Sequence, residues 1–340
     1  MGVCYLHIGP HKAASTYLQK SISRNRDLLE SEEISVPWLE NDGPSQVHHN
    51  LAHELSKHWR FSKKSKTFND LESFLRDRGP RNILITSENF ENISQDRELL
   101  EYLGDFFSRL GFDIRVLVVV RPQTGLINSG YTEQIRRLLH RKTFPEAVET
   151  ALNHRNQKYD MNLNFRYWME YFDCQFIPLN DDVRAKGLDR VFFEKLGLAD
   201  KALARLRGGE AANEAPGPKT VEAARTIRSI LENLAGRDLK AKNLTGGLAI
   251  RRTLMRRSTK LGWNDTKFYG YDEKLFRRVD AHFREANDRF SQRVFGRPWS
   301  EMFSERPKAR NVFHLNEASR REKREFQDLV KDVLYSMYKP

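Results

Sequence analysis

The sequence predicts an α/β protein with a central parallel sheet flanked by helices, followed by a mostly helical C-terminal portion. Segments of strand length, such as Ile114–Val120, are apolar at nearly every position. A strand with one face in solvent would alternate between apolar and polar residues, so these runs predict strands covered on both faces. Segments with helical periodicity separate them, and this alternation favours parallel strands joined by helices.

The expected elements follow in chain order. Residues 2–8 form the first strand, and a helix runs from residue 15 into the region of residues 25–29. Residues 35–66 show no clear periodicity and are predicted to be an irregular insertion at the carboxyl edge of the sheet, where ligands bind. The remaining predicted strands are 82–87, 114–120 and 175–179, and the remaining predicted helices are 67–77, 96–110, 145–152, 162–172, 188–196, 219–234, 272–295 and 316–338.

The chain is long enough to bury a sizeable core as one large domain. We expect a single α/β domain over residues 1–310, in which residues 35–66 and 205–260 are insertions that cover a substrate or cofactor. Residues 311–340 are expected to form a C-terminal amphipathic helix packed on that domain. Apolar side chains there recur at helical spacing, at Phe326, Leu329, Val330, Val333, Leu334 and Met337.

The 340 residues carry a formal net charge of +12. Residues 205–260 hold 13 Lys and Arg against 5 Asp and Glu, a net charge of +8. Such a surplus suggests an anionic partner, although a solvated basic surface has the same composition.

Composition also indicates a compartment. No apolar run approaches the roughly 20 residues of a membrane span, and the N-terminus lacks the basic and long apolar regions of a signal peptide. The only cysteines, Cys4 and Cys174, cannot form a disulfide framework or a cysteine zinc site. We therefore expect a cytoplasmic protein without a transmembrane segment.

The segment after the first strand predicts an anion site. It reads Gly9-Pro10-His11-Lys12-Ala13-Ala14-Ser15-Thr16, a tight turn and small residues leading into a helix. Unpaired backbone N–H groups and the positive end of the helix dipole converge there. Lys12 adds a full charge, and the hydroxyls of Ser15 and Thr16 add donors.

This loop differs from that of nucleotide-hydrolysing proteins. Their motif, Gly-x4-Gly-Lys-[Ser/Thr], places the lysine on the terminal phosphates and the hydroxyl on Mg²⁺. Here the lysine comes three residues after Gly9, and the strand 114–120 ends in Arg121 where a magnesium site would need a carboxylate. The pattern favours an anion cradle that works without a metal.

Two further strand ends meet the same edge of the predicted sheet. Glu88 follows the strand 82–87, and Arg121 follows the strand 114–120. Ser129 lies eight residues after Arg121, so a guanidinium and a hydroxyl could grip one phosphate from two sides. Each charged residue alone could instead form an ordinary ion pair with a neighbour.

Together these motifs resemble the sulfotransferases that use 3′-phosphoadenosine 5′-phosphosulfate (PAPS), most closely the bacterial branch related to carbohydrate sulfotransferases. In that family a Lys-Thr-Gly-Thr-Thr loop follows the first strand, as Lys12-Ala13-Ala14-Ser15-Thr16 does here. A later strand ends in Arg, with Ser eight residues on and commonly a Tyr after it, as at Arg121, Ser129 and Tyr131.

The resemblance implies a three-layer fold like that of P-loop nucleotide hydrolases. It also implies that residues 12–16 bind the 5′-phosphosulfate, with Lys12 on the bridging oxygen, and that Arg121, Ser129 and Tyr131 hold the 3′-phosphate. Glu88 matches the catalytic Glu of the carbohydrate branch. The implied acceptor is a hydroxyl, as on a saccharide, with neither a metal nor nucleic acid involved. Ala13 and Ala14 depart from the family's Thr-Gly, which removes one hydroxyl and places a Cβ in the turn.

Three histidines and a tryptophan complete the candidates. His11, beside Lys12, could act as a second acid–base group, or it could make a structural hydrogen bond. Trp38, His48 and His49 lie in the irregular segment and are expected to help shape the acceptor site. The His48-His49 pair lacks a third ligand at helical spacing, so we expect no metal there.

Two other functions are compatible with parts of the pattern. A phosphotransferase (kinase) on the same fold would require Mg²⁺ and ATP. A nucleic-acid-binding protein would use the basic 205–260 region and would show steep salt dependence, although no recognised nucleic-acid motif accompanies that charge.

Overall fold

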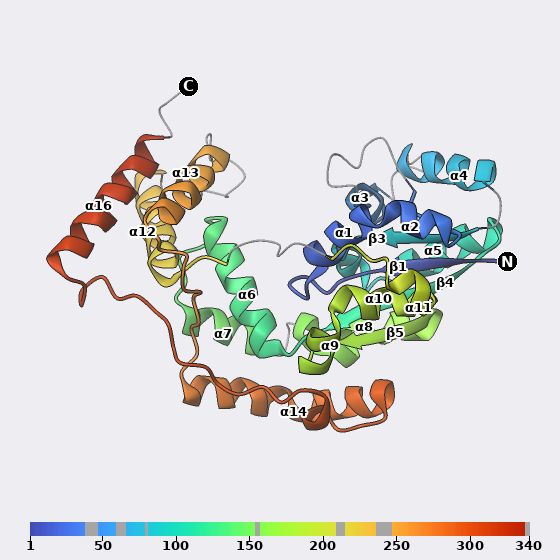
Figure 1. Ribbon diagram of the computed structural model, residues 1–340. Helices are drawn as coiled ribbons and strands as arrows, with labels where there is room; N and C mark the ends of the chain where they lie inside the picture. Colours follow the sequence, from blue (N-terminus) through green and yellow to red (C-terminus); the bar gives the residue numbers. More distant parts are fainter. Residues whose placement is uncertain are drawn as a thin grey trace. The chain divides into compact units, whose positions relative to one another are not determined.

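The structure is a computed structural model of the whole chain. It describes residues 1–37, 47–58, 66–78, 81–153, 157–208, 215–235 and 247–336 (Figure 1). The chain groups into two compact units, each considered by itself below. Unit 1 comprises Met1–Pro122, Gln157–Ala212 and Phe283–Ser304, and unit 2 comprises Gln123–Asn156, Asn213–His282 and Glu305–Pro340. The sequence-based domain boundaries stay a prediction.

Unit 1 contains a five-stranded parallel sheet. Its strands are β1 (Gly2–His7), β2 (Ile34–Ser35), β3 (Asn82–Thr86), β4 (Phe112–Val120) and β5 (Asp173–Pro178), in the order β2-β3-β1-β4-β5. β1 is central, with Leu6 beside Ile85 of β3 and Val116 of β4. The last five residues of β4 are all buried, as expected for a strand covered on both faces.

Helices cover both faces of this sheet. On one face, α1 (Ser15–Arg24) contacts α10 (Leu188–Lys195), whose Phe192 ring meets His7 of β1 edge-on at 5.3 Å. On the other face, α5 (Arg97–Arg109) packs on β4 and on α8 (Met161–Tyr171). α4 (Lys66–Arg78) joins α5 through its Phe68 ring, 4.9 Å from that of Phe106. The predicted three-layer α/β fold with a parallel sheet is confirmed.

The strand order predicts a crevice at the carboxyl edge. The connection after β1 runs towards β2, whereas the chain after β4 continues towards β5 on the opposite side. Ligands of open α/β sheets bind where neighbouring connections diverge in this way. The ends of β1 and β4 therefore mark the expected binding edge.

Two local expectations differ from the structure. The first helix is interrupted at Asn25, so that α2 (Arg26–Ser31) is separate from α1. The Asn25 side chain donates to the Ser21 carbonyl at 2.8 Å and competes with continued helix formation. Residues 35–66 are not wholly irregular, because they contain α3 (His49–His58), whose Leu51 and Leu55 are buried.

Unit 2 is helical in the part that the structure describes, as predicted for the C-terminal portion. Its helices are α6 (Gln123–Arg136), α7 (Phe144–Leu152), α12 (Pro218–Ala235), α13 (Gly247–Lys260) and α16 (Arg320–Tyr335). α16 packs on α12 and α13, and its buried stripe includes Phe326, Leu329, Val330 and Val333. Met337, predicted to continue this stripe, lies outside the described residues.

The remaining elements are short, apart from one helix that spans both units. They are η2 (Glu88–Ile93), η3 (Gln157–Tyr159), α9 (Asp181–Lys186), α11 (Asp200–Leu203), α15 (Trp299–Met302) and the long α14 (Glu273–Phe295). Across the described helices, length and apolar character never combine to the degree that crossing a membrane requires.

Candidate functional site

The loop between β1 and α1 has an unusual backbone. Lys12 and Ala14 both adopt left-handed conformations, with φ of 69° and 65°, and the Gly9–Pro10 peptide bond is cis. The Ala13 side chain between them is fully buried, and the Ala13 N–H donates to the Pro10 carbonyl at 3.2 Å. Position 14 therefore does hold a Cβ in the turn, in a conformation that glycine adopts more readily.

This loop presents the start of α1 as an anion site. Ala14 occupies the N-cap position and makes no side-chain capping hydrogen bond. The Ser15 hydroxyl donates back to the Pro10 carbonyl at 3.5 Å and is buried, whereas Thr16 is exposed. The first amides of the helix and the positive end of its dipole are thus the groups suited to an anion.

Arg121 links this loop to the neighbouring strand. Its Nη1 donates to the Lys12 carbonyl oxygen at 2.8 Å, so the end of β4 is tied to the loop after β1. Two cationic side chains therefore originate at the crevice that the strand order predicts. Both positions match the sequence-based expectation that these strand ends meet.

Glu88 lies at the end of β3, beside the same loop. Its Oε2 accepts from Gln19 Nε2 of α1 at 2.6 Å, and its Oε1 lies 3.9 Å from His49 Nε2. Burial raises the pKa of Glu88, but the Gln19 hydrogen bond and the nearby imidazoles of His49 and His11 outweigh it, so its pKa is lowered. Glu88 is therefore ionised at neutral pH and can accept a proton.

Glu91, one turn after Glu88 in η2, contacts the backbone of the loop between β1 and α1. Only 4% of its side chain is exposed. Its Oε2 accepts the His11 backbone N–H at 3.0 Å and lies 3.5 Å from Lys158 Nζ, and its Oε1 accepts from Asn164 Nδ2 at 3.3 Å. Glu91 thus holds the loop through its backbone rather than by presenting a reactive group.

The His11 ring lies over the same carboxylate, with Nε2 3.8 Å from Glu91 Oε2. Burial lowers the pKa of His11, and the charges of Lys158 and Lys12 act in the same direction against those of Glu91 and Glu88. A neutral imidazole is therefore favoured at neutral pH. At 3.8 Å the ring is too far from Glu91 for a hydrogen bond, so both the structural and the catalytic role of the His11 side chain stay predictions.

The two adjacent histidines have different surroundings. His48 is fully buried, accepts the Thr86 N–H at 3.1 Å through Nδ1, and contacts the Pro37 carbonyl at 3.0 Å through Nε2. Burial lowers its pKa to about 4. His49 is partly exposed, and its Nδ1 lies 2.8 Å from Ser87 Oγ. His49 therefore belongs to the Glu88 cluster, whereas both nitrogens of His48 bond to the backbone.

The structure does not test two of the predicted site residues. Ser129 lies on α6 in unit 2, where its carbonyl accepts from the Thr132 hydroxyl at 3.0 Å, and its pairing with Arg121 stays a prediction. Trp38 lies outside the described residues. Within the described ranges, no group of three or more His, Cys, Asp or Glu side chains is placed to hold a metal ion.

The sequence did not single out Gln19 or Glu91. Gln19 follows Ser15 by one helical turn, and Glu91 follows Glu88 by one turn of η2, so each spacing places it near a residue already selected. Only the three-dimensional contacts show that both side chains turn inwards, Gln19 towards Glu88 and Glu91 towards the His11 backbone and Asn164.

Comparison with known proteins yields little. No protein-family model matches the chain, and no curated protein matches it either. Among solved structures, it is similar to one from the PezAT chromosomal toxin–antitoxin system of Streptococcus pneumoniae. The two share 13% sequence identity with a TM-score of 0.27, over 69% of this chain and 88% of the other. A likeness of this degree carries no argument about function.

Proposed function

We propose that this protein is a PAPS-dependent sulfotransferase that moves a sulfuryl group to a hydroxyl, as on a saccharide. The observation that carries the proposal is the hydrogen bond from Arg121 to the Lys12 carbonyl. It joins two cationic strand ends at the crevice of the sheet, beside the ionised Glu88. A cation at the end of β4, where a magnesium site would use a carboxylate, favours this reaction over phosphoryl transfer from a nucleotide–metal complex.

The residues present fit a phosphosulfate donor. The uncapped start of α1 and the Lys12 ammonium would hold its phosphate and sulfuryl oxygens, and Arg121 with Ser129 would hold the 3′-phosphate. Ala13 and Ala14 leave the backbone amides of the loop in place. When bound, PAPS supplies the activated sulfuryl group.

The chain's own residues would then manage charge and the proton. Glu88 takes the proton of the acceptor hydroxyl while that oxygen forms its bond to sulfur. The bond from sulfur to the phosphate oxygen breaks, and its electron pair stays on the phosphate. Lys12 and the amides of α1 stabilise the negative charge that accumulates there.

Calorimetric titration with adenosine 3′,5′-bisphosphate, with Mg²⁺ and with EDTA, tests the proposal. We expect micromolar binding in both conditions. Lys12→Ala should weaken binding at least about tenfold, because it removes a charge-assisted contact, whereas the matched control Lys20→Ala, exposed on α1, should not change it. Failure to bind, or ATP turnover that requires Mg²⁺, would sink the proposal and favour a phosphotransferase.

Transfer of sulfate from PAPS to a panel of saccharides tests the chemical step. Glu88→Gln should abolish turnover and leave the affinity for adenosine 3′,5′-bisphosphate unchanged. A Gln variant that keeps its activity would show that Glu88 is not the base.

We also propose that the protein is cytoplasmic, because its two cysteines are free thiols.

A further inference from the structure

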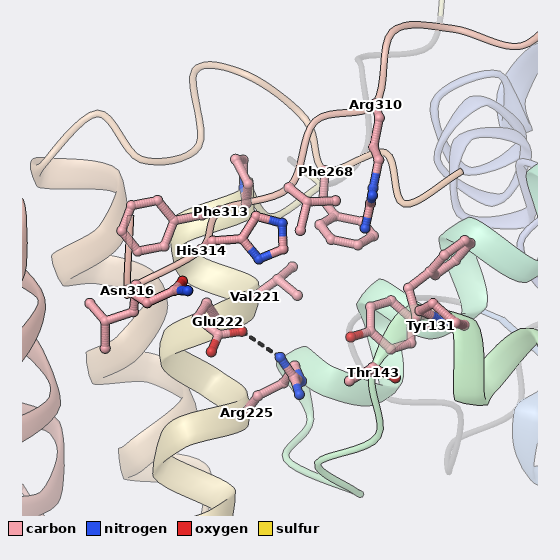
Figure 2. A pocket seen from close by; sticks show the side chains of 15 residues that line it. Tyr131, Thr143, Val221, Glu222, Arg225, Phe268, Arg310, Phe313, His314 and Asn316 are labelled. Carbon is pink, nitrogen blue, oxygen red and sulfur yellow. Dashed lines mark hydrogen bonds and ion pairs between the residues drawn. The ribbon is translucent and has the colours of Figure 1, made fainter. Parts of the chain in front are cut away.

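Unit 2 contains a cavity of its own, with a volume of about 410 Å³ (Figure 2). Residues of α6, α7 and α12 and of the segment 310–316 line it. Its size falls within the range of pockets for small organic ligands. Of the motif Arg121, Ser129 and Tyr131, only Tyr131 lines it.

The floor of the cavity is aromatic and firmly packed. The Tyr131 ring lies 5.2 Å from that of Phe144 and 5.4 Å from that of Phe268, and all three side chains are buried. The Tyr131 hydroxyl donates to the Lys142 carbonyl at 3.1 Å. A Cβ at Gly270 would lie 2.3 Å from the Phe144 ring, so the backbone closes tightly behind the floor. These rings form a preformed apolar surface for a flat group.

The walls carry more positive than negative charge. On α12, Arg225 pairs with Glu222, and Arg225 also donates to the Arg141 carbonyl at 3.2 Å. Arg310 is exposed at the opposite wall, and no carboxylate of the described residues forms an ion pair with it. Figure 2 shows Arg310 and His314 extending towards the interior from one side and Tyr131 facing them from the other. The Arg310 guanidinium is therefore the cationic group of this cavity that can bind an anion.

This cavity is distinct from the proposed donor site. Ser129 and Tyr131 are two residues apart on α6, so their side chains point about 200° apart around the helix axis. Tyr131 lines the cavity, and Ser129 does not. Ser129, proposed above to hold the 3′-phosphate, therefore lies on the face of α6 opposite to the cavity, and the Tyr131 side chain contributes to the cavity instead.

We propose that this cavity is a second ligand site, which binds an organic anion with a flat, aromatic body. The rings of Tyr131, Phe144 and Phe268 contact the body, and Arg310 pairs with the carboxylate or a similar group. This site is independent of sulfuryl transfer, and its occupancy does not require a nucleotide.

Calorimetric titration of the whole protein with naphthalene-2-carboxylate tests the site. Naphthalene-2-carboxamide, which has the same ring system without the charge, is the ligand control. We expect saturable binding of the carboxylate and at least about tenfold weaker binding of the amide, because a charge-assisted hydrogen bond is lost. Arg310→Gln should lower the affinity for the carboxylate by a similar factor and leave that for the amide unchanged.

Arg306→Gln is the matched protein control, since Arg306 is exposed four residues before Arg310 and does not line the cavity. Phe268→Leu should weaken the binding of both ligands, because both carry the same ring system. This variant therefore tests the contact with the ring system separately from the contact with the charge. Equal binding of carboxylate and amide, or wild-type affinity in Arg310→Gln, would overturn the proposal. Displacement of the carboxylate by adenosine 3′,5′-bisphosphate would also overturn it, because the ligand would then occupy the donor site.

Discussion

Replacement of Glu91 should loosen the anion loop and destabilise unit 1. The Glu91 carboxylate is almost fully buried and accepts hydrogen bonds from the His11 backbone and the Asn164 side chain. A hydrogen bond to a charged group contributes about 1.5–3 kcal/mol, and a buried donor without a partner costs a similar amount. Lys158 is about half exposed, so its ion pair with Glu91 adds at most about 1 kcal/mol.

From these contacts we expect Glu91→Ala to lower the free energy of unfolding by about 3 kcal/mol, since neighbouring losses do not add fully. Glu91→Gln retains one carbonyl acceptor and should lose about 1–2 kcal/mol. Urea unfolding followed by circular dichroism measures both variants. The control, Glu98→Ala, removes an exposed carboxylate near the start of α5 and should cost no more than about 1 kcal/mol.

A local measurement distinguishes the effect of Glu91 on the loop from its effect on the overall stability of unit 1. Amide hydrogen exchange at His11 should accelerate in both Glu91 variants, because that amide loses its charged acceptor. The affinity for adenosine 3′,5′-bisphosphate should fall in parallel as the loop becomes less ordered. If Glu91→Ala unfolds within about 0.5 kcal/mol of wild type and its His11 amide exchanges at the wild-type rate, the carboxylate does not hold the loop.

Three further predictions concern the same region. Ala14→Gly should raise the unfolding free energy by about 1 kcal/mol, because φ is +65° at this position; an unchanged urea midpoint would contradict this. His48 has its pKa lowered to about 4 by burial, so stability is full above pH 6.5 and falls towards pH 4. His48→Gln should flatten that decline by up to about 1.4 kcal/mol per pH unit in urea titrations at successive pH values. Gln19→Leu removes a hydrogen bond that lowers the pKa of Glu88, so the acid limb of the pH–rate profile for sulfuryl transfer should move to higher pH; an unmoved limb would contradict the assignment.

The sheet was predictable wherever a strand is long and buried on both faces. β4 has enough consecutive apolar residues to be recognised from the sequence alone. β2 was not predicted, because a pairing of two residues, Ile34 and Ser35, shows no period. α13 also went unpredicted, since its basic residues interrupt the apolar pattern and only a few positions, such as Ile250 and Leu254, mark its buried side.

The candidate site was predictable where chemistry follows directly after a strand. Lys12, Glu88 and Arg121 each stand at a strand end, and parallel strands bring such ends to one edge. The residues that brace them could not be recognised in this way. Gln19 and Glu91 are polar residues on helical segments, and sequence patterns place such residues in solvent. Their burial depends on contacts with residues distant in the sequence, Gln19 with Glu88 of η2, and Glu91 with His11 of the loop and Asn164 of α8.

The two alanines of the loop show how distant side chains can hold a backbone conformation that the residues of the turn do not favour. Left-handed conformations at Lys12 and Ala14 turn the chain sharply around the buried Ala13, and neither residue is the glycine that such a turn favours. Contacts outside the turn must therefore hold it, and the structure contains two of them. Arg121 donates a hydrogen bond to the Lys12 carbonyl, and Glu91 accepts one from the His11 amide. Both contacts are made to backbone atoms of the loop, so they hold its conformation directly. A loop with glycine in the turn would need this bracing less, so Glu91 should matter less for stability in the Ala14→Gly background than in the wild-type protein.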